Sequence, residues 1–223
     1  MLRENIASVE ERIARACARA GRRREEITLL AVTKRFSPAV MIEAFEAGLR
    51  DFGENYVQEF EGKAPALTGI EGARFHLIGR LQSNKSRRAA ELFDAIQTVD
   101  SEKLARRLGV VAGELRKTLA VMIEVKLSAE EAKHGAAAES LNELAAAIRA
   151  TPGLCLGGLM TMPPWSEDPE APRPYFARLR ELAQPLGVTQ LSMGMSNDFE
   201  TAIEEGATHI RVGTALFGRR PKP

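Results

Sequence analysis

Residues 29–38 read LLAVTKRFSP, and this stretch contains the unit from which the fold is built. The apolar run 27–33 is rich in β-branched and aliphatic residues and is too short for a helix, so it predicts a buried strand. Pro38 then opens a helical stretch that stops at Gly48, with proline at the start and glycine at the end as expected. Lys34 lies between the two elements, which raises the question of what a cation does at the end of a buried strand.

The same pairing of a short strand and a helix repeats along the chain. Several of the strand-like runs are continuously apolar, as in parallel sheets that helices cover on the outside. The runs are residues 27–33, 50–52, 73–79, 94–99, 118–127, 154–162, 189–194 and 207–213. Helical patterns follow all but the last, at 38–48, from 55, and at 83–93, 101–115, 140–150, 171–186 and 197–206.

Eight such units predict a fold of the α/β class, a single (β/α)8 TIM-type barrel. An extra N-terminal helix is expected at 2–20, where apolar residues recur at helical spacing. A doubly wound sheet is the alternative. The sequence shows no linker or low-complexity segment, so we expect one domain over residues 1–223.

Composition excludes several classes of protein. Lys plus Arg is 31 and Asp plus Glu is 30, a balance that argues against nucleic-acid binding. The basic stretch NKSRR (84–88) lacks interleaved aromatics and is better explained as a solvated helix face. The two cysteines suit a reducing, cytoplasmic setting, and no Cys/His spacing indicates a metal site. No signal-peptide core or apolar run of ~20 residues is present, so no membrane attachment is expected.

Lys34 has two interpretations. It could extend along the surface with its ammonium group in solvent. In a barrel, however, the ends of the strands form the active face, where partial burial lowers the pKa of an amine. A neutral amine can form a Schiff base with an aldehyde.

The ends of the seventh and eighth strands resemble a phosphate cradle. Ser192 and Thr214 offer hydroxyl groups, and Gly194 and Gly213 let backbone N–H groups approach an anion. Alternatively, Ser196 or Asn197 only caps the next helix, with Glu200 completing a capping box. An amine and a phosphate cradle in one barrel mouth fit an aldehyde that carries a phosphate, and pyridoxal 5'-phosphate is the obvious candidate.

Arg211 adds a detail to this hypothesis. Alternation places Arg211 and Gly213 on one side of the eighth strand and Ile210 and Val212 on the other. If the first side faces the lumen, Arg211 lies one layer below the phosphate site, level with a pyridine ring. An arginine at the ring nitrogen would keep it unprotonated and weaken the ring as an electron sink. The alternative is a structural salt bridge with a nearby glutamate.

Five stretches of the sequence, in this order, resemble the pyridoxal phosphate homeostasis proteins, which are single-domain relatives of the alanine racemase barrel. They are AVTKRFSPAVMIEAFEAGLRDFGENYVQE (31–59), HLIGRLQSNK (76–85), VKLSAEEAKHG (125–135), GLMTMPP (158–164) and LSMGMSNDFETAIEEGATHIRVGTALFG (191–218). The resemblance implies a (β/α)8 barrel that holds pyridoxal phosphate as an aldimine on Lys34. It also implies phosphate contacts near Ser192, Gly213 and Thr214, and a contact from Arg211 to the ring nitrogen. Asn55 matches a family residue near the cofactor, and His76 and Met193 fall in family motifs.

The resemblance implies a non-catalytic protein that carries or regulates the cofactor in vitamin B6 homeostasis, with apo-enzymes as possible recipients. A racemase or lyase is the first alternative, but a racemase needs a proton-transfer group on each face of the substrate. Alanine racemases take one from a second domain, which we expect this chain to lack, and Tyr56 is only a weak substitute. The lack of a second domain also predicts a monomer or weak dimer.

A Schiff-base aldolase is the second alternative, with Glu54 and Glu124 as the nearest carboxylates. Pairing of Glu124 with Lys126 would instead give that glutamate a structural role.

Overall fold

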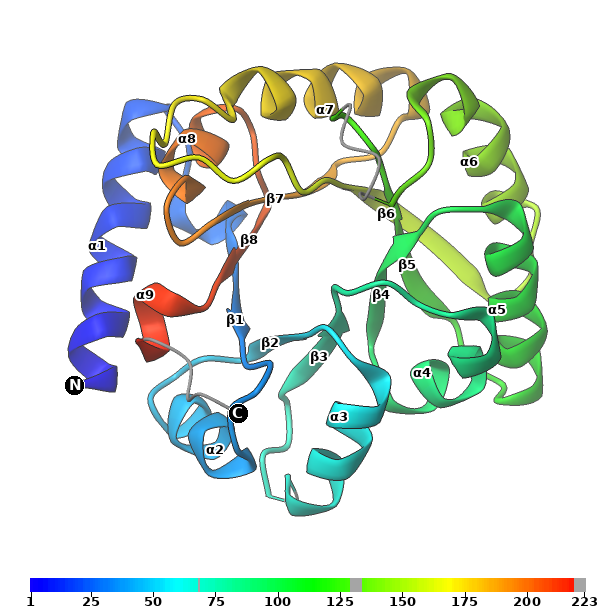
Figure 1. Ribbon diagram of the computed structural model, residues 1–223, viewed down its shortest axis with the longest axis horizontal. Helices are drawn as coiled ribbons and strands as arrows, with labels where there is room; N and C mark the ends of the chain where they lie inside the picture. Colours follow the sequence, from blue (N-terminus) through cyan, green and yellow to red (C-terminus); the bar gives the residue numbers. More distant parts are fainter. Residues whose placement is uncertain (68, 129–133, 219–223) are drawn as a thin grey trace.

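Eight parallel strands close into a barrel in a computed structural model that describes residues 1–67, 69–128 and 134–218. Neighbours in sequence are neighbours in the sheet, and β1 pairs with β8 to complete the circle (Figure 1). The strands are β1 (Thr28–Val32), β2 (Asp51–Glu54), β3 (Arg74–Leu77), β4 (Ala95–Val99), β5 (Leu119–Glu124), β6 (Leu154–Met160), β7 (Gln190–Met195) and β8 (His209–Val212). The predicted (β/α)8 barrel is confirmed, and the doubly wound alternative is wrong because the sheet has no open edge.

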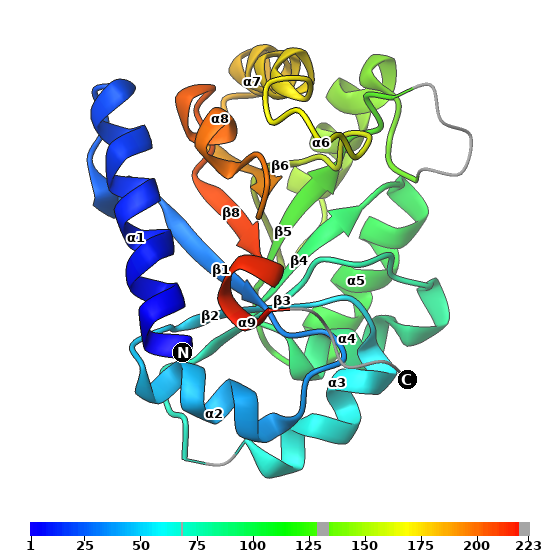
Figure 2. The same ribbon diagram turned by 60° about the vertical axis from the view of Figure 1, so that its left-hand side comes forward.

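Helices form a ring around the strands, and seven of them connect one strand to the next (Figures 1 and 2). They are α2 (Pro38–Glu46), α3 (Val57–Lys63), α4 (Ser86–Leu92), α5 (Glu102–Glu114), α6 (Leu141–Arg149), α7 (Arg173–Leu186) and α8 (Phe199–Glu204). Short 3-10 turns at Arg24–Glu26, Ala64–Ala66, Ser83–Lys85 and Ala138–Ser140 flank the longer elements. Several predicted helices therefore begin later than their sequence pattern suggested.

The barrel has two cores because the side chains of each strand alternate between its faces. Outward-facing residues such as Ile210 and Val212 join the large cluster beneath the helices. Leu30, Val32 and Ile78 form a small separate apolar cluster. Arg211 is buried between Ile210 and Val212 on the opposite face of β8, and its hydrogen bonds reach β7 and the end of β6.

The N-terminal helix α1 (Leu2–Arg19) takes the place of a long helix after β8. The helix that follows β8, α9 (Thr214–Phe217), is a single turn, and α1 packs against both α8 and α9 (Figure 2). Asn5 Nδ2 donates to Leu216 O at 2.8 Å, and Arg12 pairs with Glu200 at 2.8 Å. The expected N-terminal helix is therefore the element that covers the seam between the first and last strands.

A search of the described helices for a membrane span finds none with the required length and apolar character.

Candidate functional site

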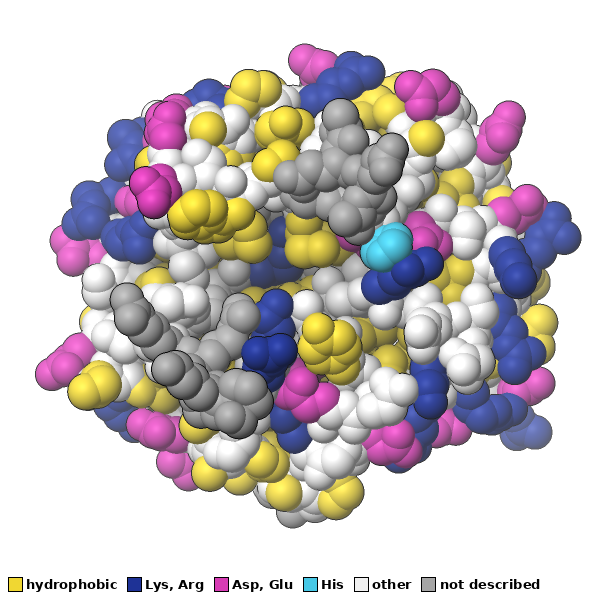
Figure 3. Space-filling view, viewed as in Figure 1, with side chains coloured by type: hydrophobic (Ala, Val, Ile, Leu, Met, Phe, Trp, Pro, Cys, Tyr) yellow, Lys and Arg dark blue, Asp and Glu magenta, His cyan; other side chains and the backbone are white. Residues whose placement is uncertain are grey.

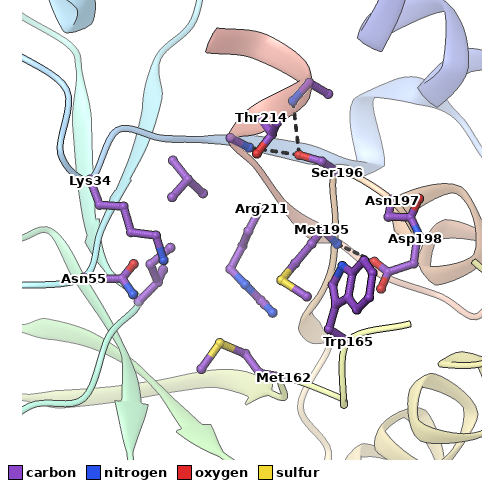
Figure 4. Close-up of a pocket in the computed structure, with 14 residues that line it drawn as sticks. Lys34, Asn55, Met162, Trp165, Met195, Ser196, Asn197, Asp198, Arg211 and Thr214 are labelled. Carbon is purple, nitrogen blue, oxygen red and sulfur yellow. Dashed lines mark hydrogen bonds between the residues drawn. The ribbon is translucent and has the colours of Figure 1, made fainter. Parts of the chain in front are cut away.

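One cavity of about 570 Å³ opens at the carboxyl ends of the strands, where barrel enzymes carry their sites. Figure 3 shows this face hollowed at its centre, and Figure 4 shows side chains converging on the hollow from loops far apart in sequence. The lining residues are Val32, Lys34, Asn55, Ile78, Met162, Trp165, Met195, Ser196, Asn197, Asp198, Arg211, Gly213, Thr214 and Ala215.

Lys34 stands in a tight turn immediately after β1. The turn closes with a hydrogen bond from Phe36 N to Thr33 O at 3.0 Å, and Arg35 adopts a left-handed backbone conformation with φ of 66°. This conformation is uncommon for residues other than glycine and indicates that the surroundings fix the turn. The half-buried Lys34 side chain lies in the cavity beside Asn55 (Figure 4).

Asn55 follows β2 and presents a buried acceptor to the cavity. Among the residues that the structure describes, its Oδ1 atom has no hydrogen-bond partner. The loop after β3 lies tightly against it, because a Cβ atom on Gly79 would come 2.2 Å from Asn55 O. A buried unpaired acceptor is costly, so this side chain is suited to a ligand that donates a hydrogen bond.

The loops after β7 and β8 are joined by a serine hydroxyl. Ser196 Oγ accepts hydrogen bonds from Gly213 N and Ala215 N, both at 3.3 Å, and Thr214 lies between these donors (Figure 4). Helix α8 begins at Phe199 with Asp198 as its N-cap residue, whose Oδ1 accepts from Met195 N at 2.6 Å. The alternative in which Ser196 or Asn197 caps this helix is therefore wrong.

Glu200, expected to complete the capping box, pairs instead with Arg12. Position 194 requires a glycine for two reasons. Its φ is 89°, which other residues rarely adopt, and a Cβ atom there would come 2.6 Å from Ala202 Cβ. This glycine therefore serves the close packing of α8 against β7.

Arg211 is a fully buried cation at the floor of the cavity. Its Nη1 donates to Ser192 Oγ and its Nη2 to Thr161 O, each at 2.8 Å. Burial lowers the pKa of Arg211 to about 10, against the opposing effect of Asp198 and Glu124. The described partners of the guanidinium are thus neutral oxygens. They include no glutamate, so the alternative of a direct salt bridge is wrong.

A line of hydrogen bonds continues from Arg211 through the lumen. Ser192 Oγ donates to Gln97 Oε1 at 2.6 Å, and Gln97 Nε2 lies 3.2 Å from His76 Nδ1. His76 Nε2 lies 2.9 Å from Asp51 Oδ1. Since Gln97 accepts from Ser192 through its oxygen, its amide nitrogen donates to His76 Nδ1, which leaves the Nε2 proton for Asp51.

Arg74 holds the other end of this lumen line with two hydrogen bonds to Asp51, at 2.8 and 2.6 Å. Burial alone would raise the pKa of Asp51, but hydrogen bonds from His76 and Arg74 outweigh it and lower that pKa. Asp51 is therefore an anion that anchors the line at the amino ends of the strands.

Glu124 ends β5 and is buried beside an adjoining cavity of about 330 Å³, which shares Met162, Trp165 and Met195 with the first. Burial raises its pKa to about 7, although Arg211 lowers it in part. Among the described ion pairs there is none between Glu124 and Lys126, so the structural explanation expected for this glutamate fails.

Five of the seven residues proposed from the sequence line the large cavity. They are Lys34, Asn55, Arg211, Gly213 and Thr214. Ser192 lies below the cavity floor in the lumen line, and Met193 is buried in the outer core. His76 also belongs to the lumen line and not to the cavity.

Sequence reasoning missed several lining residues. Met162 and Trp165 follow β6 and line the cavity, but no side-chain chemistry in the sequence assigned either of them a role there. Ser196 was considered only as a helix cap. Gln97 had a recognisable signal, because it is a polar residue inside an apolar strand.

The basic stretch 84–88 is largely neutralised by neighbouring carboxylates. Arg87 pairs with Glu91 and Glu114, and Arg88 pairs with Glu61 and Glu91. This pairing favours the interpretation as a solvated helix face over a nucleic-acid interface. In the part of the chain that the structure describes, no group of three or more His, Cys, Asp or Glu could hold a metal ion.

The barrel and its cavity define a member of the alanine racemase class: a family model described as "Alanine racemase, N-terminal domain" matches residues 5–221. The pyridoxal phosphate homeostasis protein of Pseudomonas aeruginosa is 47% identical over 219 residues, covering 97% of this chain and 95% of that protein. The protein of the same name from Aquifex aeolicus is 43% identical over 223 residues, covering 97% of each. The chain therefore belongs to the pyridoxal phosphate homeostasis protein family.

Solved structures show the same likeness. PipY of Synechococcus elongatus is 37% identical, and the comparison covers 98% of this chain and 100% of PipY. The TM-score is 0.89 for PipY without PLP and 0.87 for PipY with PLP bound.

Proposed function

We propose that the chain binds pyridoxal 5'-phosphate covalently through Lys34 and serves as a non-catalytic carrier or regulator of this cofactor in vitamin B6 homeostasis. The observation that carries the proposal is the convergence of Lys34, Arg211 and the Ser196–Ala215 loop contact on one cavity. The names of the relatives, and the PLP bound in a PipY structure, support it.

The residues of the cavity fit this cofactor. When bound, it supplies an aldehyde, a phosphate and an electron-accepting ring. Lys34, which lines the cavity, would hold the cofactor by joining its amine to the aldehyde carbon with loss of water, so that no oxidant or reductant would be needed. Asn55 Oδ1, which has no hydrogen-bond partner among the described residues, is suited to accept from a ligand hydroxyl. Gly213 and Thr214 are assigned to the phosphate together with Ser196, and Arg211 to the ring nitrogen.

The character of the cavity favours a carrier over an enzyme. The titratable groups that line it are Lys34, Asp198 and Arg211, and the Asp198 carboxylate already accepts from Met195 N. Trp165, on the cavity wall, is 73% exposed. Such an open site suits exchange of a cofactor better than carbanion chemistry, which benefits from exclusion of water.

One observation supports pyridoxal phosphate-dependent amino-acid chemistry as a second candidate. Glu124 is a buried carboxyl group near the cavity with a pKa of about 7, which suits a general acid or base. Glu54, the other carboxylate considered for an aldolase, is engaged with Thr33 and Lys63. The carrier remains the better account because Glu124 borders the adjoining cavity and not the one that Lys34 lines.

The test is to titrate the purified protein with pyridoxal phosphate, record the visible spectrum, reduce with borohydride and map the labelled peptide by mass spectrometry. We expect a yellow band and a label on Lys34, and loss of both in Lys34→Ala. Lys103→Ala, which removes an exposed lysine of α5, is the matched control and should behave as wild type. Equally firm binding by Lys34→Ala would refute the assignment.

Assays of the same loaded protein with amino acids separate the two functions. A carrier leaves amino acids unchanged while releasing cofactor to an apo-enzyme. Racemisation or elimination that is lost in Glu124→Gln would establish the second candidate instead.

A further inference from the structure

The turn that carries Lys34 rests on a cluster formed by the buried Glu54 and Lys63 and the half-buried Glu59, none of which lines the cavity. Lys63 lies in α3 and is 7% exposed, which is unusual for a lysine. Its ammonium contacts Glu54 Oε1 at 2.8 Å, Glu59 Oε1 at 2.6 Å and Thr33 O at 3.0 Å. Three acceptors match the three protons of the group.

The described hydrogen bonds from this cluster to backbone atoms reach Thr33 O and Arg35 N, on either side of Lys34. On the N-terminal side, Lys63 holds Thr33 O, and Thr33 Oγ1 donates to Glu54 Oε1 at 2.8 Å. On the C-terminal side, Glu59 Oε1 accepts from Arg35 N at 2.5 Å. Arg35 is the residue with the left-handed backbone, so Glu59 binds the turn at its strained point.

We propose that Lys63, with Glu54 and Glu59, is a positioning device that fixes the direction of the Lys34 side chain and so sets the rate at which its amine captures the aldehyde. This inference rests on the proposed function, because it concerns the same lysine. Lys63 does not line the cavity; it acts through the backbone of Thr33 and, by way of Glu59, of Arg35.

The decisive variant is Lys63→Met, which keeps the length of the side chain and removes its charge and donors. A misplacement of about 1 Å can cost on the order of 100-fold in rate, and we expect covalent capture of pyridoxal phosphate to slow to that extent. Binding of pyridoxine 5'-phosphate, which has the phosphate and ring but no aldehyde, should stay near wild type. A merely structural role would instead weaken both ligands together.

A pair of substitutions at Glu59 gives an independent test if Lys63→Met does not fold. Glu59→Gln retains an oxygen that can accept from Arg35 N, and Glu59→Ala does not, although both remove the charge. We expect capture to be slow in Glu59→Ala and restored toward wild type in Glu59→Gln. Arg24→Met, which breaks the Arg24–Glu10 ion pair outside this cluster, is the control and should capture at the wild-type rate.

The outcomes also separate this inference from the proposed function. Absence of a Lys34 label in the wild type would overturn the function itself. A wild-type label, with equal capture rates in Lys63→Met, Glu59→Ala and the control, would overturn the positioning role alone.

Discussion

Arg211 is a buried guanidinium whose direct partners are neutral. Its charge is offset by Asp198 and Glu124 through the low-dielectric interior, while Ser192 and Thr161 orient it. A cation held in this way stays rigid, because turning it would leave two buried oxygens without their donor. That rigidity suits a residue assigned to keep a ring nitrogen unprotonated.

Replacement of Arg211 should change how bound cofactor responds to pH. Without the guanidinium the ring nitrogen can take up a proton, so we expect the visible spectrum of loaded Arg211→Ala to shift with pH where the wild type does not. Ser192→Ala, which keeps the charge and removes one of its partners, should show a smaller change. An unchanged spectrum and pH response in Arg211→Ala would contradict the ring-nitrogen assignment.

Glu124 should make the free energy of unfolding depend on pH. Its pKa is about 7 in the folded state and 4.5 ordinarily, so below pH 4.5 it is protonated in both states. As pH rises, the unfolded chain ionises first, and the stability that neutral Glu124 contributes is lost through pH 7. We therefore expect Glu124→Gln to be more stable than wild type above pH 7, by roughly 3 kcal/mol.

Denaturant unfolding at several pH values measures this difference, which should vanish below pH 4.5. Glu43→Gln, a change of the same charge on the exposed face of α2, is the control and should follow the wild type. A Glu124→Gln curve parallel to wild type at every pH would show that burial of this carboxyl has no energetic cost.

The positions of the serines show what sequence could and could not predict at the scale of single residues. Alternation along β8 correctly put Arg211 opposite Ile210 and Val212. It could not tell which serine after Leu191 reaches the cavity, because that depends on where β7 ends. The strand continues to Met195, so Ser192 lies inside it and Ser196 is the first residue beyond it.

At the scale of elements, α1 is the helix whose contribution is easiest to measure. Ile13 is fully buried in the core beneath it, and truncating such a side chain costs about 2–5 kcal/mol. We expect Ile13→Ala to lose stability in that range by denaturant unfolding. Val110→Ala on α5, whose side chain is 56% exposed, should change stability by less than about 0.5 kcal/mol. Equal effects of the two would mean that α1 does not stabilise the barrel.

The elements that sequence predicted well are those with long periodic patterns. The helices α1, α5 and α7 fall within or on their predicted ranges, since many apolar positions define each of them. The one-turn helix α9 and the 3-10 turns were not predicted, because three or four residues carry no periodic signal. The start of α4 is an example: residues 83–85 form a 3-10 turn, whereas the sequence pattern predicted that they belong to the α-helix.

For the whole molecule, the count of repeated units was the decisive information. Eight alternating strands and helices permit a closed barrel, and the continuous apolar runs required helices on the outside. Closure of the barrel then determines the site, since it brings the ends of β1, β2, β3, β6, β7 and β8 around one cavity. The lumen line from Arg211 to Arg74 was beyond prediction because it links five strands through side-chain contacts that depend on barrel register.

The seam between β1 and β8 has a consequence for the order in which the protein forms. Arg12 and Glu200 are 188 residues apart, and Asn5 and Leu216 are 211 apart, so the contacts across the seam join segments that are synthesised at widely separated times. Until β8 emerges, β1 has one edge unpaired, and exposed edges of this kind recruit other chains. The sheet therefore stays open until β8 is made, and pairing of β8 with β1 removes the exposed edge.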